Sequence, residues 1–315
     1  MRLSIIIPVY NEEKNVSLLA QELSAAMDGQ GFDYEAIWVN DGSRDKSWEE
    51  IEKIVAKNRR FKALNFHKNC GQTAAIAAGI AHASGDLIVP MDADLQNDPQ
   101  DIQKLLAKLD DGFDVVSGWR QGRWSDKSLT RKLPSYLANK LISRVTGVAL
   151  NDYGCTLKIY RREFLENVKL YGEMHRFIPA YAAWQGGRVA EMPVNNRPRK
   201  FGQTKYGLSR TFRVVLDLLF VKFFFKYQDR PIHFFGGAGI ISILFSLVFF
   251  GWAIFYKVAG LKDFVSTPLP TLGALFFIVG INFILMGVLA ELFIRAYFES
   301  RNRGVFSIKE KINFD

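Results

Sequence analysis

Residues 3–13 read LSIIIPVYNEE, an apolar run rich in isoleucine that passes through a proline into a polar cluster. Short runs with β-branched residues and polar ends are typical of buried strands. Similar runs recur over roughly the first 120 residues, and stretches with helical periodicity separate them. This alternation predicts an α/β domain with a mostly parallel sheet. The expected strands are Leu3–Val9, Glu35–Asn40, Lys62–Phe66, Asp86–Met91 and Asp114–Ser117, and the expected helices are Glu12–Asp28, Asp45–Asn58, Gly71–Ala83 and Pro99–Leu109.

Start signals and charge patterns extend this assignment. Asp45 is expected as an N-cap, and Asp98-Pro99 places a proline at a first helical position. Further along, the sequence predicts a basic helix over Ser128–Val148, a strand around Arg188–Pro193 and a basic loop over Asn195–Gly207. Thr211–Tyr227 mixes large apolar residues with Arg and Lys, as a helix in the membrane interface does, although a helix covering a domain has the same pattern.

Two long apolar stretches, Ile232–Val258 and Leu269–Phe293, follow. Each exceeds the roughly 20 residues that a helix needs to cross a bilayer. Core helices of a large soluble protein are the alternative, but such helices seldom run that far without a charge. Basic residues flank the pair on both sides, which places both flanks in the cytoplasm. The expected domains are an α/β domain over 1–207, an interfacial helix over 208–230, two membrane helices over 231–294 and a basic tail over 295–315.

The formal net charge of +9 indicates an anionic partner. Beside two membrane spans, lipid head groups and a phosphorylated substrate fit better than nucleic acid. The two cysteines, Cys70 and Cys155, lie in the expected cytoplasmic part, where no disulfide is expected. No P-loop and no Gly-x-Gly-x-x-Gly follows the first strand, which argues against a P-loop nucleotidase and a dinucleotide cofactor. Gly236, Gly237 and Gly239 could pack helices together in a homo-oligomer.

Polar clusters follow the expected strands, and parallel sheets bind ligands at these carboxyl ends. Glu12 and Asp41 could each accept a hydrogen bond from a base or a ribose hydroxyl, although turn formation explains both equally well. Asp92 and Asp94 follow a buried run, and two such carboxylates repel each other unless a cation neutralises them. A hard cation such as Mg²⁺ with a nucleotide diphosphate fits this pair. The alternative is that Asp94 only caps the next turn.

Basic side chains cluster in two places, where phosphate binding competes with ordinary surface solvation. Asp152, in the stretch DYGC, is a candidate base or a turn former. A phosphate acceptor is already anionic near neutral pH, so it needs no strong base. The first cluster holds Arg120, Arg123, Lys127, Arg131 and Lys132, and the second holds Arg197, Arg199, Lys200 and Lys205.

Taken together, IIIPVYNEE, VNDGS, MDADLQNDP, DYGC and FGQTKYG, followed by two spans, resemble the polyprenyl-phosphate glycosyltransferases of glycosyltransferase family 2. The likeness covers nearly the whole chain and is greatest to a bacterial branch that uses undecaprenyl phosphate. The Gln-x-x-Arg-Trp signature of processive synthases is missing, because Gln121-Gly122-Arg123-Trp124 is one residue short. A processive polymerase is therefore a poor fit.

The resemblance implies a GT-A fold, a Mg²⁺ or Mn²⁺ ion and inversion at the anomeric carbon by direct attack of the lipid phosphate. It also implies a bacterial inner-membrane enzyme with its catalytic domain and both termini in the cytoplasm. By the same resemblance, the nucleotide is cradled by Pro8, Tyr10, Glu12 and Asp41, and the metal is surrounded by Asp92, Asp94 and Gln96. The acceptor phosphate is bound by Arg120 and Arg131, and a diphosphate or the acceptor phosphate is reached by Arg199 and Lys205. Asp152 matches a position proposed as base.

The expected function is transfer of a sugar from a nucleotide sugar to undecaprenyl or another polyprenyl phosphate, for a cell-envelope glycan or lipid A modification. A UDP donor is expected, with glucose, a uronic acid and a modified arabinose all open. Two alternatives stay open as well. One is a non-catalytic nucleotide-sugar sensor or flippase component, and the other is a family 2 transferase with a non-lipid acceptor.

Overall fold

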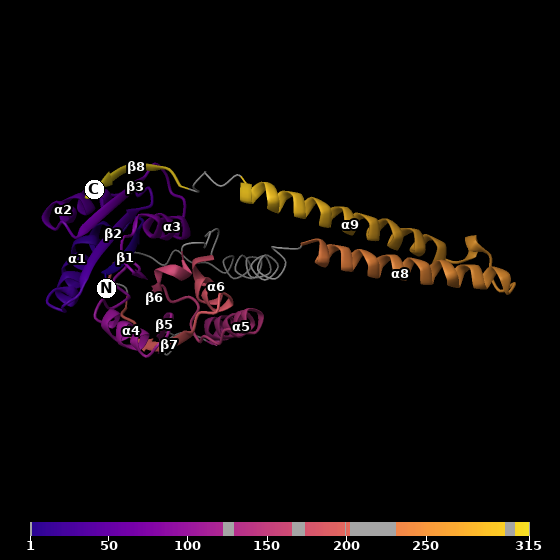
Figure 1. Ribbon diagram of the computed structural model, residues 1–315, viewed down its shortest axis with the longest axis horizontal. Helices are drawn as coiled ribbons and strands as arrows, with labels where there is room; N and C mark the ends of the chain where they lie inside the picture. The colour runs from indigo at the N-terminus through magenta and orange to yellow at the C-terminus, as the bar shows by residue number, and fades with distance from the viewer. Residues whose placement is uncertain are drawn as a thin grey trace. The chain divides into compact units, whose positions relative to one another are not determined.

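The computed structural model describes residues 2–121, 129–165, 174–198, 200–201, 231–299 and 306–314, with the backbone alone at 129–135, 137–138, 231–232 and 294–299. These residues fall into two compact units (Figure 1). The first is an α/β unit that contains the described residues up to 201 and the C-terminal stretch 306–314. The second is a helical hairpin within 231–299.

One mixed sheet organises the α/β unit. In the part of the chain that the structure describes, its strand order is β7-β5-β6-β4-β1-β2-β3-β8. The strands are β1 (Arg2–Val9), β2 (Asp33–Asn40), β3 (Phe61–Phe66), β4 (Leu87–Pro90), β5 (Val115–Arg120), β6 (Lys158–Arg161), β7 (Val189–Val194) and β8 (Ile308–Ile312). The helices of this unit are α1 (Glu13–Met27), α2 (Ser47–Lys57), α3 (Gln72–His82), α4 (Asp101–Asp110), α5 (Leu129–Thr146) and α6 (Ile178–Trp184), and the 3-10 turns are η1 (Arg162–Phe164) and η2 (Met174–Arg176).

Two strands of this sheet run against the others. β6 is antiparallel to β4 and β5, and β8 is antiparallel to β3, whereas every other pairing is parallel. The carboxyl ends of β1 to β5 and of β7 therefore meet at one edge of the sheet. Because β6 is reversed, its amino end lies at that edge too. The mostly parallel sheet that the sequence predicted is confirmed, with β6 as an addition that shapes this edge.

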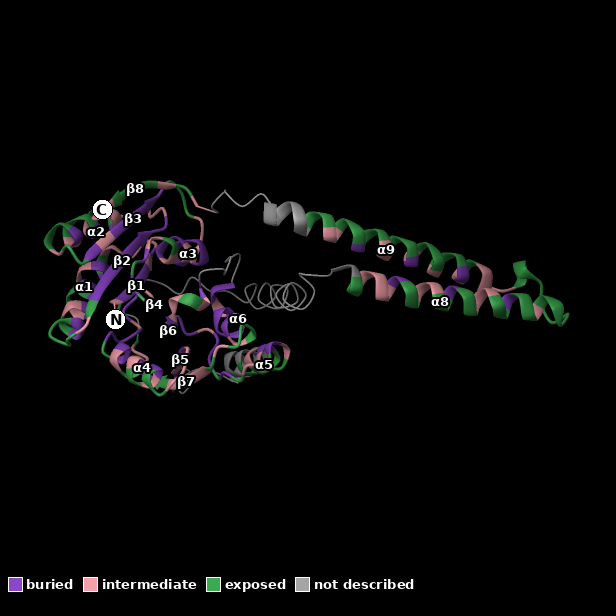
Figure 2. Cartoon of the chain, viewed as in Figure 1, coloured by how far each residue is buried: buried purple, intermediate pink, exposed green. Residues whose placement is uncertain are grey.

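The central strands are apolar on both faces, which explains why LSIIIPV reads as a continuous run. Ile5 and Ile7 belong to one core cluster, together with Leu19 of α1 and Ile51 of α2. Ile6 lies on the other face, where the side chain of residue 79 in α3 would overlap it if that residue were not glycine. Helices on both faces of the sheet thus bury all of β1 except Arg2 and Pro8, and Figure 2 shows the central strands mostly in the colour of buried residues.

Several element ends differ from the expectation. α2 begins at Ser47, so Asp45 is not its N-cap, although the Asp45 carboxylate accepts hydrogen bonds from the Ser47 amide and hydroxyl at 3.0 and 2.5 Å. α4 begins at Asp101, so Pro99 lies in the preceding turn, where Asp98 accepts from the Gln100 amide at 3.1 Å. The helix expected over 211–227 and the predicted domain boundaries at 207 and 230 lie outside the described residues.

The hairpin consists of α8 (Pro231–Val258) and α9 (Leu269–Glu299), joined by a turn that contains the 3-10 turn η3 (Phe264–Ser266). Both helices are long and apolar enough to cross a membrane. Only 17% of the most apolar window of each helix is buried, and Figure 2 shows exposed residues along both. Core helices of a soluble protein would be mostly buried, so this exposure favours spans that face lipid.

Small residues bring α8 and α9 together. A side-chain carbon at Gly239 would lie 2.7 Å from the Gly280 carbonyl oxygen, and one at Gly280 would lie 2.9 Å from the Gly239 carbonyl oxygen. Ser246 donates a hydrogen bond to the Gly273 carbonyl across the same interface, at 2.7 Å. Close backbone approach at small residues is typical of membrane helices. Gly239 therefore packs α8 against α9 within one chain, whereas the sequence suggested a role for it between chains of a homo-oligomer.

Candidate functional site

Asp41, directly after β2, is held by the loop that joins β3 to α3. Its carboxylate accepts hydrogen bonds from the Cys70 amide at 2.6 Å, the Gly71 amide at 2.9 Å and the Asn69 side-chain amide at 2.8 Å. Burial raises the pKa of Asp41, and the two backbone amides act against that rise. In these contacts Asp41 ties two loops together at the carboxyl edge of the sheet.

The two loops also touch through their backbones. Gly42 has a φ of +63°, and a side-chain carbon there would lie 2.5 Å from the Asn69 nitrogen. Only glycine fits this position, because any side chain would push the loop away and would strain the backbone. The Asp-Gly pair of VNDGS is thus required for the close approach of the two loops.

The residues expected around the nucleotide lie at the end of β1. Pro8 is paired within the strand with Val39 of β2, and Tyr10 is half-buried just beyond it. The Glu12 carboxylate accepts a hydrogen bond from the Asn15 side chain at 2.6 Å. The Glu12 amide donates to the Ser47 hydroxyl at 2.8 Å. The structure therefore brings Pro8, Tyr10, Glu12 and Asp41 to neighbouring strand ends.

Asp92 and Asp94 follow β4 at the same edge. The Asp92 carboxylate accepts from the Gln72 side chain at 2.7 Å and from the Thr156 hydroxyl at 2.9 Å. Burial, with the charge of Asp94 as the next cause, raises the pKa of Asp92 to about 6. Asp92 is half-buried, and its negative charge and that of Asp94 oppose each other at this edge.

Asp94 is buried, and its carboxylate accepts from the Gln96 backbone amide at 3.1 Å. Leu95 between them has a φ of +62°, which is a strained conformation for a bulky residue. Among the described residues, no three His, Cys, Asp or Glu side chains gather as a metal-ligand cluster. Two neighbouring carboxylates nevertheless suit Mg²⁺ or Mn²⁺, because Mg²⁺ is usually bound by one or two carboxylates together with substrate phosphates.

Arg120 and Asp152 form a buried ion pair. Arg120 ends β5, and its guanidinium donates to both carboxylate oxygens of Asp152, at 2.7 and 3.0 Å. Asp152 also accepts from the Gly154 amide at 3.1 Å. Burial alone would lower the pKa of Arg120, but the neighbouring acidic groups, with Asp152 first among them, together outweigh it and raise that pKa. The expected phosphate ligand and the expected base are thus paired with each other.

A segment over 151–158 connects this pair to Asp92, and sequence reasoning missed the residues that hold it. The Glu191 carboxylate on β7 accepts from the amides of Asn151 and Asp152 at 2.9 and 3.0 Å. The buried Lys158 ammonium donates to the carbonyls of Tyr153 and Cys155, and burial lowers the pKa of Lys158 to about 8. A lysine inside the apolar stretch LKIY is the signal that could have pointed to this buried role.

Part of the second basic cluster has a structural partner. Arg197 donates to Glu22 at 2.6 Å and pairs with Asp98 at 2.6 Å, and Lys200 lies 3.6 Å from Glu22. Arg197 therefore links the loop to α1 and to the turn before α4. Arg123, Lys127, Arg199 and Lys205, and the side chains of Arg131 and Lys132, lie outside the described residues, so their expected roles stay predictions.

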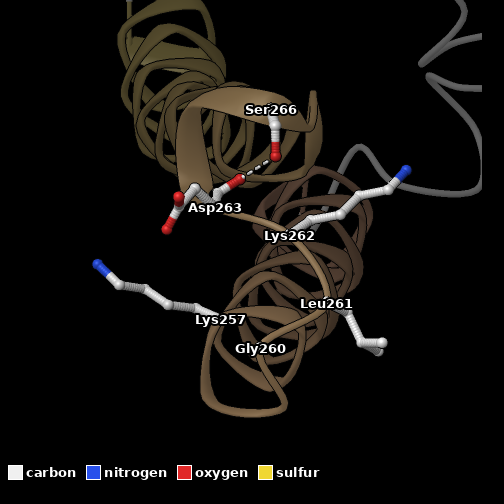
Figure 3. Close-up of a pocket in the computed structure, with 6 residues that line it drawn as sticks. All are labelled: Lys257, Gly260, Leu261, Lys262, Asp263 and Ser266. Carbon is white, nitrogen blue, oxygen red and sulfur yellow. Dashed lines mark hydrogen bonds between the residues drawn. The ribbon is translucent and has the colours of Figure 1, made fainter.

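The turn of the hairpin contains a separate hollow, which Figure 3 shows. Within it the Ser266 hydroxyl donates to the Asp263 carbonyl at 2.7 Å. The hollow belongs to the turn between α8 and α9, whereas Asp41, Asp92, Arg120 and Asp152 all belong to the α/β unit. It is lined by Lys257, Gly260, Leu261, Lys262, Asp263 and Ser266.

Comparison with known proteins identifies the family of the chain. Residues 4–169 match the family model "Glycosyl transferase family 2". The dodecaprenyl-phosphate galacturonate synthase of Rhizobium johnstonii is 42% identical over 302 residues, which cover 95% of this chain and 89% of that protein. The undecaprenyl-phosphate 4-deoxy-4-formamido-L-arabinose transferase of Shewanella sediminis is 36% identical over 312 residues, which cover 98% and 91%.

Solved structures give the fold. The glucosyl-3-phosphoglycerate synthase of Mycobacterium tuberculosis, in complex with Mn²⁺, UDP and glucosyl-3-phosphoglycerate, superposes with a TM-score of 0.57 at 18% identity. The match covers 70% of this chain and 79% of that one, and at this identity it shows a common α/β fold of the GT-A type. The resemblance drawn from the motifs is confirmed, and the chain belongs to glycosyltransferase family 2.

Proposed function

We propose that the protein transfers a sugar from a nucleotide sugar to a polyprenyl phosphate. The observation that carries this proposal is the meeting of the half-buried Asp92 and the buried Asp94 with the Arg120–Asp152 pair at one sheet edge, in a family 2 chain with a long apolar hairpin. The two relatives above support the acceptor class, because both names include a polyprenyl phosphate and both matches extend through the hairpin.

Asp92 and Asp94 would hold the divalent ion, with Gln96 beside them. Burial and the neighbouring charge of Asp94 raise the pKa of Asp92, which fits a site that a cation neutralises. When bound, Mg²⁺ or Mn²⁺ would offset the charge that develops on the leaving diphosphate. Gln72 and Thr156 each donate to one oxygen of Asp92 and so orient its carboxylate. These contacts fix the orientation of the Asp92 carboxylate.

The reaction needs no strong base in this scheme. An oxygen of the acceptor phosphate attacks the anomeric carbon, the bond from that carbon to the diphosphate breaks, and the configuration inverts. Arg120 supplies positive charge near the incoming phosphate, and Asp152 fixes the guanidinium plane through two hydrogen bonds. Asp152 thus acts on the acceptor through Arg120.

The nucleotide is proposed to lie near Pro8, Tyr10, Glu12 and Asp41, with Arg131, Arg199 and Lys205 available to phosphates. We propose a UDP donor, and the sugar is proposed to be a uronic acid, a modified arabinose or glucose. A UDP-linked uronic acid is the first donor to test, because the relative at 42% identity is named as a galacturonate synthase.

The test is a transfer assay on the purified full-length protein. With Mn²⁺, polyprenyl phosphate and a panel of nucleotide sugars, the wild type is expected to form a glycolipid that mass spectrometry detects. Asp94→Asn is expected to lower kcat by at least about 100-fold, since it removes charge that faces the metal. Asp110→Asn, at the exposed end of α4, is the matched control and should retain full activity.

Three outcomes would contradict the proposal. Donor binding with no turnover on any acceptor would indicate a sensor or another non-catalytic role. Transfer to water-soluble acceptors with no use of polyprenyl phosphate would indicate a non-lipid acceptor. Equal activity of Asp94→Asn and the wild type would remove these carboxylates from the reaction.

A further inference from the structure

The C-terminal strand β8 closes an edge of the sheet next to the loop that holds Asp41. β3 pairs with β2 on one side and with β8 on the other, through a ladder from Ala63↔Ile312 to Phe66↔Ile308 (Figure 1). Because β8 follows α9 in the chain, the segment that returns from the hairpin completes this edge of the α/β unit. Covering an edge strand satisfies backbone groups that would otherwise stay unpaired.

The start of β8 is fastened to the end of β3. The ring of Phe306 stacks on that of Phe66, with centroids 5.5 Å apart and planes 4° from parallel. The His67 amide donates to the Ser307 carbonyl at 3.3 Å. A bulge in the ladder falls at this same place, between Asn65 and Phe66. These contacts fix the position of the C-terminal end of β3, from which the chain continues into the loop before α3.

The residues that follow His67 are the ones that hold Asp41. The loop begins at Lys68, and its Cys70 and Gly71 amides donate to the Asp41 carboxylate. Its backbone lies so close to Gly42 that no side chain fits between them. Such close packing leaves the loop little freedom to move independently of the strand that carries it. Only a few residues separate Phe66 from the amides that bind Asp41. We therefore expect a change in the packing of Phe306 on Phe66 to alter the position of those amides.

The other end of β8 is fastened as well, but away from this loop. Phe314 packs edge-on against His82 at 5.5 Å and lies under the Lys62 ammonium at 5.2 Å. The Asn313 side chain donates to the Phe61 carbonyl at the start of β3, at 2.9 Å. One strand thus has two aromatic anchors, and only Phe306 adjoins the loop around Asp41.

We propose that β8, through Phe306, is a positioning element for the nucleotide donor. The strand that follows the hairpin in the chain would thereby keep the 68–71 loop ordered. This inference rests on the proposed function, which places the nucleotide at Asp41. The Phe306 ring acts on the donor through His67 and the loop, without touching it.

The test compares Phe306→Ala with Phe314→Ala in the full-length protein. Both variants remove one aromatic ring from a flank of β8, so they form a matched pair for any general loss of stability. Phe306→Ala is expected to raise the KM for the donor about 5–10-fold, with kcat and the acceptor KM changed less than about twofold. Phe314→Ala is expected to leave the donor KM at the wild-type value. Phe306→Leu, which keeps apolar volume, is expected to fall between them and serves if the alanine variant does not fold.

Amide hydrogen exchange provides a readout that does not depend on the donor. Phe306→Ala should speed exchange at Cys70 and Gly71 at least about 10-fold, and Phe314→Ala should not. Unchanged exchange at these amides, or equal effects of the two variants on donor KM, would overturn the inference. Faster exchange with an unchanged donor KM would also overturn it and would count against Asp41 as a nucleotide ligand. Sugar transfer by the wild type would still stand in each case, so the two proposals fail separately.

Discussion

At the scale of single residues, Asp92 combines burial, a neighbouring acid and two hydrogen-bond donors. Burial and Asp94 raise its pKa to about 6, whereas Thr156 and the charge of Arg120 act in the opposite direction. A proton and a divalent ion would therefore compete for the same carboxylate near physiological pH.

This competition predicts the pH dependence of metal binding. Above about pH 6 the Asp92 carboxylate is anionic in the metal-free protein, and below that pH a proton must leave before the ion binds. The apparent Mn²⁺ affinity is expected to fall about tenfold between pH 7 and pH 5, as calorimetry would measure. Asp92→Asn should bind weakly and lose this pH dependence. A flat affinity in the wild type over this range would contradict the assignment.

The Arg120–Asp152 pair leads to a second prediction. If Asp152 serves mainly to hold Arg120, then Asp152→Asn, Arg120→Met and the double variant should each lower kcat to a similar extent, because the effects of a shared unit do not add. Asp152→Asn should also destabilise the fold by about 3–5 kcal/mol, since it leaves Arg120 charged, buried and unpaired. Steady-state kinetics and thermal unfolding would measure these effects. Additive losses in kcat would instead favour separate roles for the two residues.

The sequence showed some of these residues better than others. Asp92 and Asp94 could be predicted because two acids directly after a buried run are unusual, and strand position alone places them. The pairing of Arg120 with Asp152 could not, because it depends on a strand that runs backwards. Gln72, Thr156 and Glu191 are ordinary polar residues whose importance comes from what they touch in space.

At the scale of elements, most parallel strands were predictable, whereas the two reversed strands, β6 and β8, were not. β1, β2 and β3 are largely apolar on both faces, so their sequences give a clear signal for buried strands. β6 is short and contains a lysine, and β8 reads IKEKI with three charged residues in its centre. β8 lies at the edge of the sheet, where charged residues are typical and backbone pairing decides the fold more than side-chain burial does. A strand of this kind has no hydrophobic signal for sequence analysis to find.

The hairpin offers a prediction with a control in the same helix. Gly239 lies against Gly280, whereas a side-chain carbon at Gly237 would meet nothing within 4 Å. Gly239→Leu is expected to separate α8 from α9 and destabilise the hairpin by about 1–3 kcal/mol, while Gly237→Leu should have little effect. Thermal unfolding of the purified protein would measure both. Equal melting temperatures for Gly239→Leu and the wild type would show that the two helices do not pack at this glycine.

At the scale of the whole molecule, the path of the chain constrains how it can lie in a membrane. The α/β unit precedes α8, and β8 joins the same unit after α9. If both helices span, a pair of crossings returns the chain to the side from which it started. The pairing of β8 with β3 also requires β8 and the rest of the α/β unit to lie on one side of the membrane, because strands on opposite sides of a bilayer cannot share a ladder. This argument uses the sheet alone, and it agrees with the excess of basic residues on both flanks of the hairpin.

The topology therefore predicts opposite sides for the turn of the hairpin and for β8. Single cysteines at Ser266, in the turn, and at Ser307, next to β8, would test this in a Cys70→Ser background; Cys155 is buried. In intact spheroplasts, a membrane-impermeable maleimide is expected to label Ser266→Cys and to leave Ser307→Cys unlabelled until the membrane is opened. Both positions are exposed or half-exposed to solvent in their own units, so a lack of labelling would reflect the membrane and not the fold. Labelling of both sites in intact spheroplasts would contradict two crossings, because the sheet pairing places β8 on the side of the α/β unit.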